Sequence, residues 1–405
     1  MKKQEFTGTF SVVISLESQD VIIDNQDIMN CYFIEDIYSY CISGKLVFFD
    51  KYGLMEHGPF TGNEQITIVY GIEEDRQLPF DIWKLSKIQQ STITDPTSEN
   101  LMELYFVDTM FELYTLKRYS KSFNGKKHTT TVINEILKNM MKIDNKRINY
   151  EESSNYITNY IIPYWTPMEA IGWLCKRSKG SESETGGYLC YNNTKNKFNT
   201  NIYTINKLLD DKNYIDPTPY IFEGSMDKKN KILDWSISGI DKNSTKILRG
   251  GNWRGYNSQT KSFLNLDYRY SDGIEDTILM GKKSLFNDIS EETVNKYIGE
   301  SDINTLENVV YSEWVKRYSL QQVVSIVVAG NEDRYVGHQI EIQWPSIKSI
   351  NYNKMMKGKY LIKSITHMFV GGGNLGYMQK MLLIKNAYSD IDMISLFPST
   401  KTNII

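Results

Sequence analysis

The sequence is poor in the residues that mark metal sites and disulfide frameworks. Among 405 residues it has only four histidines and four cysteines. They are His57, His128, His338, His367, Cys31, Cys41, Cys175 and Cys190. No second histidine or cysteine lies three or four residues from a histidine, and no cysteines form a CxxC pair, which argues against a zinc site. We expect no metal, thiols buried in apolar runs in place of disulfides, and a structural role for His367 within SITHMFV.

Long hydrophobic runs and an excess of positive charge are also absent. No run approaches 18 apolar residues, which argues against a membrane-spanning helix. The opening MKKQEFTGTFSVVISL has two lysines, but its apolar residues alternate as in a strand, and it lacks a small-residue cleavage site, so we expect no signal peptide. The net charge is −3. This balance argues against a surface that binds duplex nucleic acid through many phosphates.

Motifs for catalysis or cofactor binding are missing as well. No G-x-S-x-G is present. GGGNLG (Gly371–Gly376) formally matches G-x-G-x-x-G, but a strand is expected on both sides of it, so no helix N-terminus is available for a pyrophosphate. A pair of glycosidase carboxylates would leave no mark in the sequence, because their separation is a three-dimensional property. Nothing singles out such a pair, and we expect no enzymatic activity, no catalytic residue and no cofactor.

Strand patterns, in contrast, are abundant, and similar ones occur near both ends of the chain. Runs of β-branched, aromatic and aliphatic residues closed by Gly, Pro or Asn are typical of successive antiparallel strands. The paired runs are GNEQITI (Gly62–Ile68) with GHQIEI (Gly337–Ile342), FDIWKLSKI (Phe80–Ile88) with KYLIKSI (Lys359–Ile365), and LMELYFVDT (Leu101–Thr109) with YMQKMLLIK (Tyr377–Lys385). The repetition predicts a duplicated β domain, with one copy at each end.

Between the two copies the periodicity changes to that of helices. TTVINEILKNMMKI places its apolar residues along one helical face. In TPMEAIGWLCKRS, Thr166 suits the N-cap, Pro167 the first helical position, and Glu169 completes a capping box. GGYLCY and FNTNIYTI, joined by a polar turn, predict a hairpin. The fold class expected is therefore α+β and mostly antiparallel β, with a small α+β domain between the two β domains.

The remaining segments complete the predicted domain organisation. Polar, weakly periodic sequence after Ile240 predicts an insertion in the second β domain, with WVKRYSL (Trp314–Leu320) leading back to its strands. The predicted domains are 1–117 (first β domain), 118–225 (α+β domain), 226–249 with 311–390 (second β domain), 250–310 (insertion) and 391–405 (C-terminal tail). Leu396 and Phe397 make the tail more apolar than solvent requires, so they are candidates for partner contact or for docking on their own domain.

Several of these segments, taken in order, resemble a known family. They are SGKLVFFDKYGL, TGNEQITI, LKRYSKSFNGK, YIIPYWTPMEAIGWLCKRS, NEDRYVGHQIEIQWP, GKYLIKSITHMF and GYMQKMLLIKNA. Together they resemble the central hub protein of phage baseplates and the related hub half of type VI secretion spikes. The resemblance runs from about residue 30 to 388 and is weakest over 250–310. No fused OB-fold, lysozyme or needle is recognisable, so a separate spike protein is expected.

The resemblance implies a specific architecture and a set of partners. Such hubs are homotrimers whose chains each contribute two tail-tube-like β-barrel domains, giving a pseudo-hexameric ring between a six-fold tail tube and a three-fold spike. The implied partners are the tube ring, the spike trimer, surrounding baseplate proteins and the end of a tape-measure protein, with DNA passing through without sequence-specific binding. The implied location is the virion tail tip, after assembly in the host cytoplasm. Two alternatives remain: a hexameric distal tail or tube-initiator protein, and a tail-associated cell-envelope hydrolase.

Overall fold

The computed structural model describes most of the chain between its two termini. The described residues are 9–16, 19–51, 53–54, 62–71, 76–89, 100–195, 197–213, 218–222, 230–238, 251–257, 259–280, 283–284, 294–297, 302–319, 322–344, 357–371 and 376–388. Leu396 and Phe397, the candidate contact residues of the tail, lie outside them.

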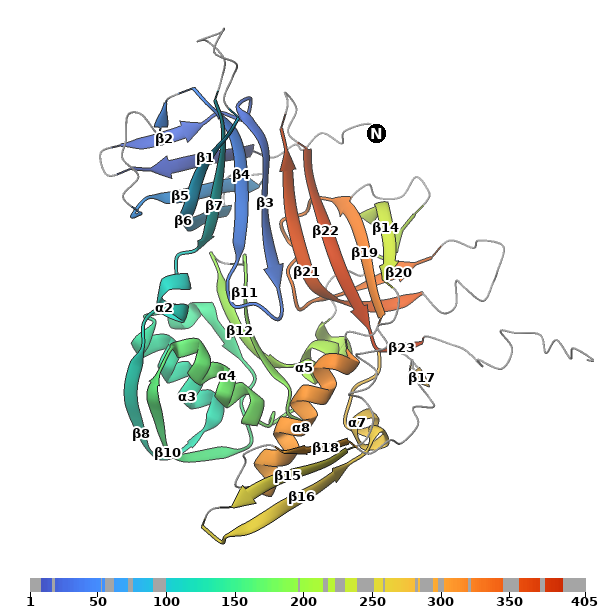
Figure 1. The fold of residues 1–405 in the computed structure, drawn as a ribbon. Coiled ribbons are helices and arrows are strands. Elements are labelled where there is room, and N and C mark those ends of the chain that lie inside the picture. The colour runs from blue at the N-terminus through green and yellow to red at the C-terminus, as the bar shows by residue number, and fades with distance from the viewer. Residues whose placement is uncertain are drawn as a thin grey trace, which may run out of the picture.

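One large sheet joins the two ends of the chain. Its first part contains β1 (Thr9–Ser15), β2 (Asp20–Ile23), β3 (Ile28–Asp36), β4 (Ser43–Asp50), β5 (Gln65–Gly71), β6 (Arg76–Gln89) and β7 (Asn100–Asp108). Its second part contains β13 (Tyr220–Ile221), β14 (Ile232–Ser238), β19 (Gln322–Ala329), β20 (Gln339–Gln343), β21 (Gly358–Val370) and β22 (Gly376–Lys385). The order along the sheet is β14-β19-β22-β21-β3-β4-β7-β6-β5-β1-β2, and Figure 1 shows the two parts meeting at β3 and β21.

The predicted antiparallel strands are confirmed in both parts. Strands β5, β6 and β7 pair successively as antiparallel neighbours, and β20, β21 and β22 do the same. These are the two sets of runs whose sequences resemble each other. The expectation of two β barrels is not confirmed, because the described strands follow an open path with an edge at each end and form no closed barrel.

The middle of the chain forms a separate α+β layer below the large sheet (Figure 1). It contains α2 (Phe111–Thr115), β8 (Tyr119–His128), α3 (Thr129–Glu135), β9 (Ile148–Tyr150), β10 (Tyr156–Trp165), α4 (Pro167–Arg177), β11 (Tyr188–Asn193), β12 (Asn199–Thr204) and α5 (Ile205–Leu209). The predicted hairpin is β11 with β12. The predicted capping box is confirmed: Thr166 Oγ1 accepts from the Glu169 backbone N–H, and the Glu169 carboxylate accepts from the Thr166 N–H.

The segment between β14 and β19 contains more regular structure than its sequence suggested. It holds β15 (Gly251–Asn257), β16 (Ser262–Tyr268), α7 (Tyr270–Glu275), β17 (Lys283–Ser284), β18 (Val294–Tyr297) and α8 (Ile303–Tyr318), while β23 (Ala387–Tyr388) pairs with β17. Trp314 to Tyr318, expected to lead into a strand, lie in α8, and the predicted boundary at residue 310 falls inside this helix. Helix α8 escaped detection because it buries residues on most of its faces, which leaves no amphipathic stripe.

Three hydrophobic cores hold these layers together. One lies in the first part of the large sheet, one joins the second part to α8, and one fills the α+β layer. The first core includes Phe369 and Tyr377, which belong to β21 and β22. The boundary between the two parts of the sheet is therefore packed as tightly as either part. In the portions of the chain that the structure describes, no helix is long and apolar enough to cross a membrane.

Candidate assembly surfaces

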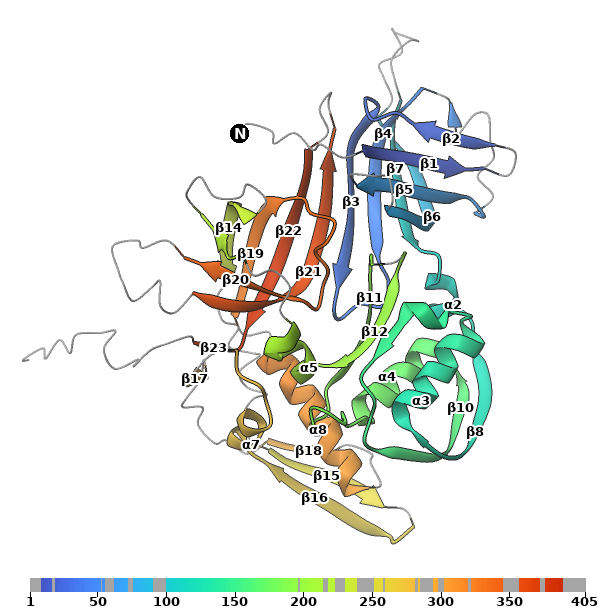
Figure 2. The same ribbon diagram turned by 180° about the vertical axis from the view of Figure 1, so that it is seen from behind.

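The junction between the two parts of the sheet is a continuous antiparallel pairing of β3 with β21. It runs from Ser364 opposite Asp36 to Val370 opposite Asn30. Seen from behind in Figure 2, the two strands again lie side by side at the centre of the upper layer. We call this pairing the seam. It connects strands more than 300 residues apart in the sequence, so it fixes the relative position of the two parts.

Buried polar side chains fasten the core side of the seam. His367 and Glu35 are both fully buried, and His367 Nε2 lies 3.0 Å from Glu35 Oε1. The other ring nitrogen of His367 lies 2.8 Å from the Tyr377 hydroxyl, while Thr194 donates to Glu35 Oε1 at 2.6 Å. Buried polar groups cost free energy unless they are hydrogen-bonded. This series of hydrogen-bonded side chains therefore favours one arrangement of β3 and β21. The structural role expected for His367 is thereby confirmed.

Aromatic rings fill the space around this polar chain. The His367 ring stacks on Phe33 with centroids 4.4 Å apart, and Phe369 stacks on Tyr377 at 4.5 Å and on Phe10 at 4.3 Å. Such ring pairs stabilise by about 0.5–1.5 kcal/mol beyond their buried area. Rings contributed by β1, β3, β21 and β22 therefore pack the seam as one unit.

A buried arginine holds the loop that precedes β20. Arg334 is 5% exposed, and its guanidinium donates to the Tyr220 hydroxyl at 2.6 Å and to Gln379 Oε1 at 2.9 Å. A further guanidinium N–H reaches Asn230 Oδ1 at 3.2 Å. The planar donor fork of arginine satisfies several acceptors at once, so it links β13, β22 and the start of β14 across the second part of the sheet.

Two exposed strand edges, β14 at one end of the sheet and the second half of β6 within it, form the other notable surface. Among the described strands, β14 pairs only with β19 in the large sheet, and residues 83–89 of β6 pair only with β7. Both edges carry exposed apolar side chains: Trp83 is 61% exposed, Trp235 39% and Ile237 37%. On β14 the Trp235 N–H donates to the Asp234 carboxylate at 2.8 Å, so pairing with another strand there would have to replace this hydrogen bond. A strand edge beside exposed apolar residues is nevertheless a surface suited to such pairing.

The face of the sheet turned away from the core carries balanced charge near the seam. Lys45 on β4 forms an ion pair with Glu103 on β7, and Lys363 on β21 pairs with Asp36 on β3 at 2.7 Å. Tyr32, Lys45 and Tyr105 occupy directly opposed positions across three neighbouring strands, and Lys45 lies 5.3 Å from the centre of the Tyr105 ring. These ion pairs balance the charge beside the seam, while Lys84 on β6, 5.8 Å from the centre of the Tyr105 ring, adds a cation toward the β6 edge.

The glycine-rich stretch and the cysteines, which the sequence analysis considered as possible sites, can now be located in the structure. The glycine-rich Gly371–Gly376 stretch is flanked by strands β21 and β22, as expected for a hairpin. Cys31 and Cys175 are buried, and burial raises the pKa of the Cys175 thiol to about 12. Within the described residues, no three His, Cys, Asp or Glu side chains gather closely enough to hold a metal ion.

Sequence reasoning missed the residues that matter most here. Glu35 could have been found, because Cys31, Phe33 and Glu35 alternate on one strand and period 2 places all three on the same, buried face. The edge residues Trp83 and Trp235 carry no such signal, since a strand is an edge only in relation to its neighbours.

We compared the sequence with known protein families and curated proteins, and the structure with solved structures. No model of a known protein family matches the sequence, and no curated protein matches it significantly. Solved structures do. A tail protein from Neisseria meningitidis MC58 matches with TM-score 0.62 and 10% identity, over 93% of this chain and 96% of that one. The 43 kDa tail protein of prophage MuSo2 from Shewanella oneidensis matches with TM-score 0.58 and 11% identity, over 93% and 98%.

A third match comes from a larger protein. A chain of the Francisella PdpA–VgrG complex matches with TM-score 0.50 and 10% identity, over 95% of this chain but only 59% of that one. The first two matches span nearly the full length of both chains, so they concern the whole arrangement and not one shared domain. The resemblance drawn from the sequence is confirmed at the level of structure: this chain has the mostly antiparallel β fold of phage tail proteins.

Proposed function

We propose that this chain is a structural component of a phage tail, the central hub of its baseplate, working as a homotrimeric ring. The observation that carries the proposal is the seam. It joins the two parts of the sheet, each of which holds one of the similar three-strand units, and the sheet leaves exposed edges at β14 and along residues 83–89 of β6. We further propose that the two units arose by duplication, since their strands agree in sequence and in pairing order.

The geometry of the edges suits ring closure. The edge at β14 differs from the edge at β6, so a contact between them is head-to-tail, and such contacts close into a ring when the rotation allows. Counting both edge strands, eight strands run from β14 to β6 along the sheet. Three chains of eight strands would give a ring of 24 strands, with four strands from each of the two sheet parts of every chain and hence six four-stranded segments. A ring of that kind can face a six-fold tube on one side and a three-fold spike on the other.

The side chains at the two edges are compatible with this contact. Each edge offers a partly exposed tryptophan, Trp235 on β14 and Trp83 on β6. Asp234 on β14 and Lys84 on β6 are exposed and of opposite charge. Aromatic pairs and opposite charges across neighbouring strands each stabilise by about 0.2–1 kcal/mol, and closure would also satisfy the backbone groups of both edges.

In such a ring the face of the sheet that is turned away from the core would line a central channel. The ion pairs of Lys45 with Glu103 and of Lys363 with Asp36 neutralise this face near the seam. A wall without a dense row of cations would release few counterions from DNA and hold it weakly, so DNA would pass without binding. The tail-tube ring, the spike trimer, the surrounding baseplate proteins and the end of a tape-measure protein are the proposed neighbours, at the tip of the virion tail.

Cysteine cross-linking tests the proposed edge contact directly. A double variant, Lys84→Cys with Ser236→Cys, places one thiol on each edge, and a short bis-maleimide should join neighbouring chains. Cys41 and Cys190 are partly exposed, but burial raises the pKa of all four native thiols and keeps them protonated at neutral pH, so they should react slowly with the maleimide. The expected products on a denaturing gel are two-chain and three-chain species, with none larger.

The single variants Lys84→Cys and Ser236→Cys are the matched controls. Each carries thiols on one edge only, and in a head-to-tail ring these lie far apart, so neither should cross-link. Products that stop at two chains, or that extend to six, would reject the trimer. Efficient cross-linking of either single variant would indicate a symmetric edge contact and reject the head-to-tail arrangement.

A further inference from the structure

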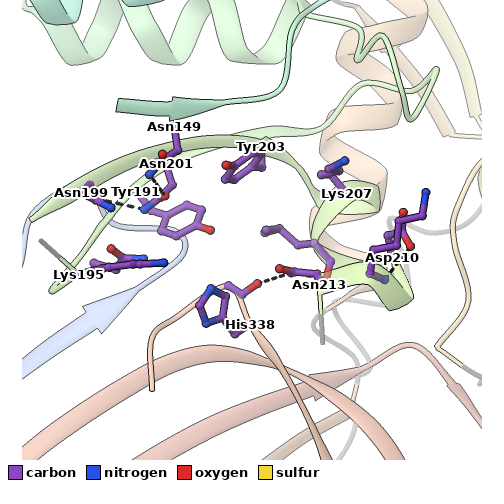
Figure 3. Close-up of a pocket in the computed structure, with 14 residues that line it drawn as sticks. Asn149, Tyr191, Lys195, Asn199, Asn201, Tyr203, Lys207, Asp210, Asn213 and His338 are labelled. Carbon is purple, nitrogen blue, oxygen red and sulfur yellow. Dashed lines mark hydrogen bonds between the residues drawn. The ribbon is translucent and has the colours of Figure 1, made fainter. Parts of the chain in front are cut away.

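A polar cavity of about 380 Å³ lies where the α+β layer meets the second part of the large sheet. Its floor is the three-stranded sheet β11-β12-β9. Helix α5 and the residues after it form one wall, and Gly337 and His338, just before β20, form another. Figure 3 shows Tyr191 and Lys195 at one end of the cavity, Lys207 and Asp210 at the other, and His338 below them. Cavities of this size are in the range that binds small ligands.

Asparagine side chains cover the floor in two rows. Asn193 lies directly opposite Asn199, and Asn201 directly opposite Asn149. Because residues two apart on a strand share a face, Asn199 and Asn201 project to the same side of β12. Asn149 Nδ2 donates to Asn201 Oδ1 at 3.2 Å, which leaves further lone pairs and N–H groups of both amides for other partners.

Several polar atoms of the cavity are buried without a hydrogen-bond partner. Asn193 is 4% exposed and Asn199 3%, and the Oδ1 atom of each has no partner. The Nδ1 atom of His338 is in the same situation. A buried acceptor left unsatisfied costs about 1–3 kcal/mol. These buried acceptors lie beside the cavity, so a ligand that donates hydrogen bonds and draws their side chains toward it would remove that cost.

The rim of the cavity adds positive charge. Lys195, Lys207 and Lys212 line it, against the single carboxylate of Asp210. Lys207 is already paired with Glu182, so the excess positive charge comes mainly from Lys195 and Lys212. Burial, and to a smaller extent the nearby Lys195, lowers the pKa of His338 to about 4, which keeps that ring uncharged at neutral pH. The site thus combines neutral amides at its floor with cations at its edge.

We propose that this cavity binds an extended, acidic peptide segment of a partner protein. Asn199 and Asn201 are two residues apart, which places them about 6.7 Å apart along the strand, and an extended peptide presents its N–H and C=O groups to one side with the same repeat. A side-chain amide can pair with a peptide group in both directions, because its C=O accepts from the peptide N–H and its NH2 donates to the peptide C=O. The lysines at the rim would attract carboxylates of the same segment. The spacing of the amides favours a peptide over a sugar.

The test uses three peptides that differ only in charge. They are Ac-Gly-Glu-Gly-Glu-Gly-NH2 and its counterparts with Gln or Lys in place of Glu, titrated into the full chain by isothermal titration calorimetry. We expect saturable binding of the Glu peptide at one site per chain, affinity at least about five-fold lower for the Gln peptide, and no binding of the Lys peptide. Lys195→Ala and Asn199→Ala should each weaken binding of the Glu peptide about ten-fold.

Lys126→Ala is the matched control, because it removes the same charge from an exposed position on β8, outside the cavity. It should change affinity less than two-fold, and thermal unfolding of each variant checks that the fold is kept. Absence of binding by the Glu peptide, or equal weakening by Lys126→Ala and Lys195→Ala, would overturn the proposal. Binding of digalacturonate in preference to the Glu peptide would also overturn it, in favour of an acidic sugar.

Discussion

Glu35 and His367 are hydrogen-bonded at 3.0 Å across the pairing of β3 and β21, and neither side chain is exposed to solvent. This one contact spans 332 positions in the sequence. It joins the two similar units at the place where their sheets become one. The continuous sheet depends on the seam that this pair of side chains stabilises. The relative position of the two exposed edges depends on the same seam.

Removal of the His367 ring should therefore destabilise the whole chain. His367→Ala leaves the buried Glu35 carboxylate and the Tyr377 hydroxyl each with one hydrogen-bond partner fewer and opens a cavity between stacked rings. We expect the free energy of unfolding to fall by about 3 kcal/mol, the scale for a buried polar group that loses its partner. Urea unfolding followed by circular dichroism measures it.

Thr366→Ala is the control for this variant. Thr366 is the preceding residue of the same strand and points to the opposite, half-buried face. It should cost less than about 1 kcal/mol, as most substitutions away from buried networks do. Equal losses in the two variants would mean that the buried polar chain contributes nothing specific to the seam.

The capping box of α4 gives a second prediction. Thr166→Ala removes the side-chain acceptor for the Glu169 N–H at the start of the helix. Loss of such a cap costs about 0.5–2 kcal/mol. Thr166→Ser, which keeps the hydroxyl, should recover most of the loss in the same urea experiment. A Thr166→Ser variant as unstable as Thr166→Ala would show that the methyl group, and not the cap, matters.

Stability should also depend on pH through His338. Its pKa is about 4 in the folded chain, lowered from about 6.5 by burial and by Lys195. Above pH 6.5 the ring is neutral in both states and makes no difference. Between pH 6.5 and 4 the unfolded chain binds a proton that the folded chain does not, so folding loses up to about 1.4 kcal/mol per pH unit.

The variant His338→Gln isolates this contribution. Its stability relative to the original chain should be nearly constant above pH 6.5 and should rise steadily as the pH falls toward 4. Urea unfolding at pH 7.5, 6.5, 5.5 and 4.5 gives the comparison. A difference that does not change with pH would show that the ring titrates normally in the folded chain.

Charge placed at an open edge should prevent assembly without unfolding the chain. Ile237→Lys puts a lysine on β14, where natural proteins use the same device to block pairing of edge strands. We expect the assembled form to dissociate to single chains, with a thermal midpoint within a few degrees of the original. Size-exclusion chromatography measures the change.

The control for Ile237→Lys is Phe263→Lys. Phe263 is an exposed apolar residue too, at 70%, but it lies on β16, in the lower layer of Figure 1 and away from both edges. This substitution should leave the assembled form intact. Dissociation by both variants alike would point to a general effect of added charge.

The sequence predicted those parts of the fold that depend on local pattern. Alternating residues located β5, β6 and β7 and their counterparts β20, β21 and β22, and Thr166 with Glu169 located the start of α4. These signals act within a few residues, so they survive without knowledge of the tertiary structure.

Features set by long-range packing could not be found in the same way. Helix α8 buries residues on most of its faces, so its sequence shows no apolar stripe with helical spacing. The seam depends on which strands pair, and the local sequence of β3 does not predict that its partner is β21. Of the cavity asparagines, Asn193 fell in the predicted polar turn and Asn199 and Asn201 in the predicted strand FNTNIYTI. Their convergence with Asn149 on one face appears only when β9 joins β12.

Closure of three chains into one ring would be seen at once in the absolute mass of the purified protein. Multi-angle light scattering on a size-exclusion column should give about 141 kDa, three times the chain mass of 47.1 kDa. The same value should hold across a ten-fold range of concentration, since a closed ring has no free edge to extend. A mass of six chains would favour a tube-initiator ring, and a single chain at every concentration would contradict the account.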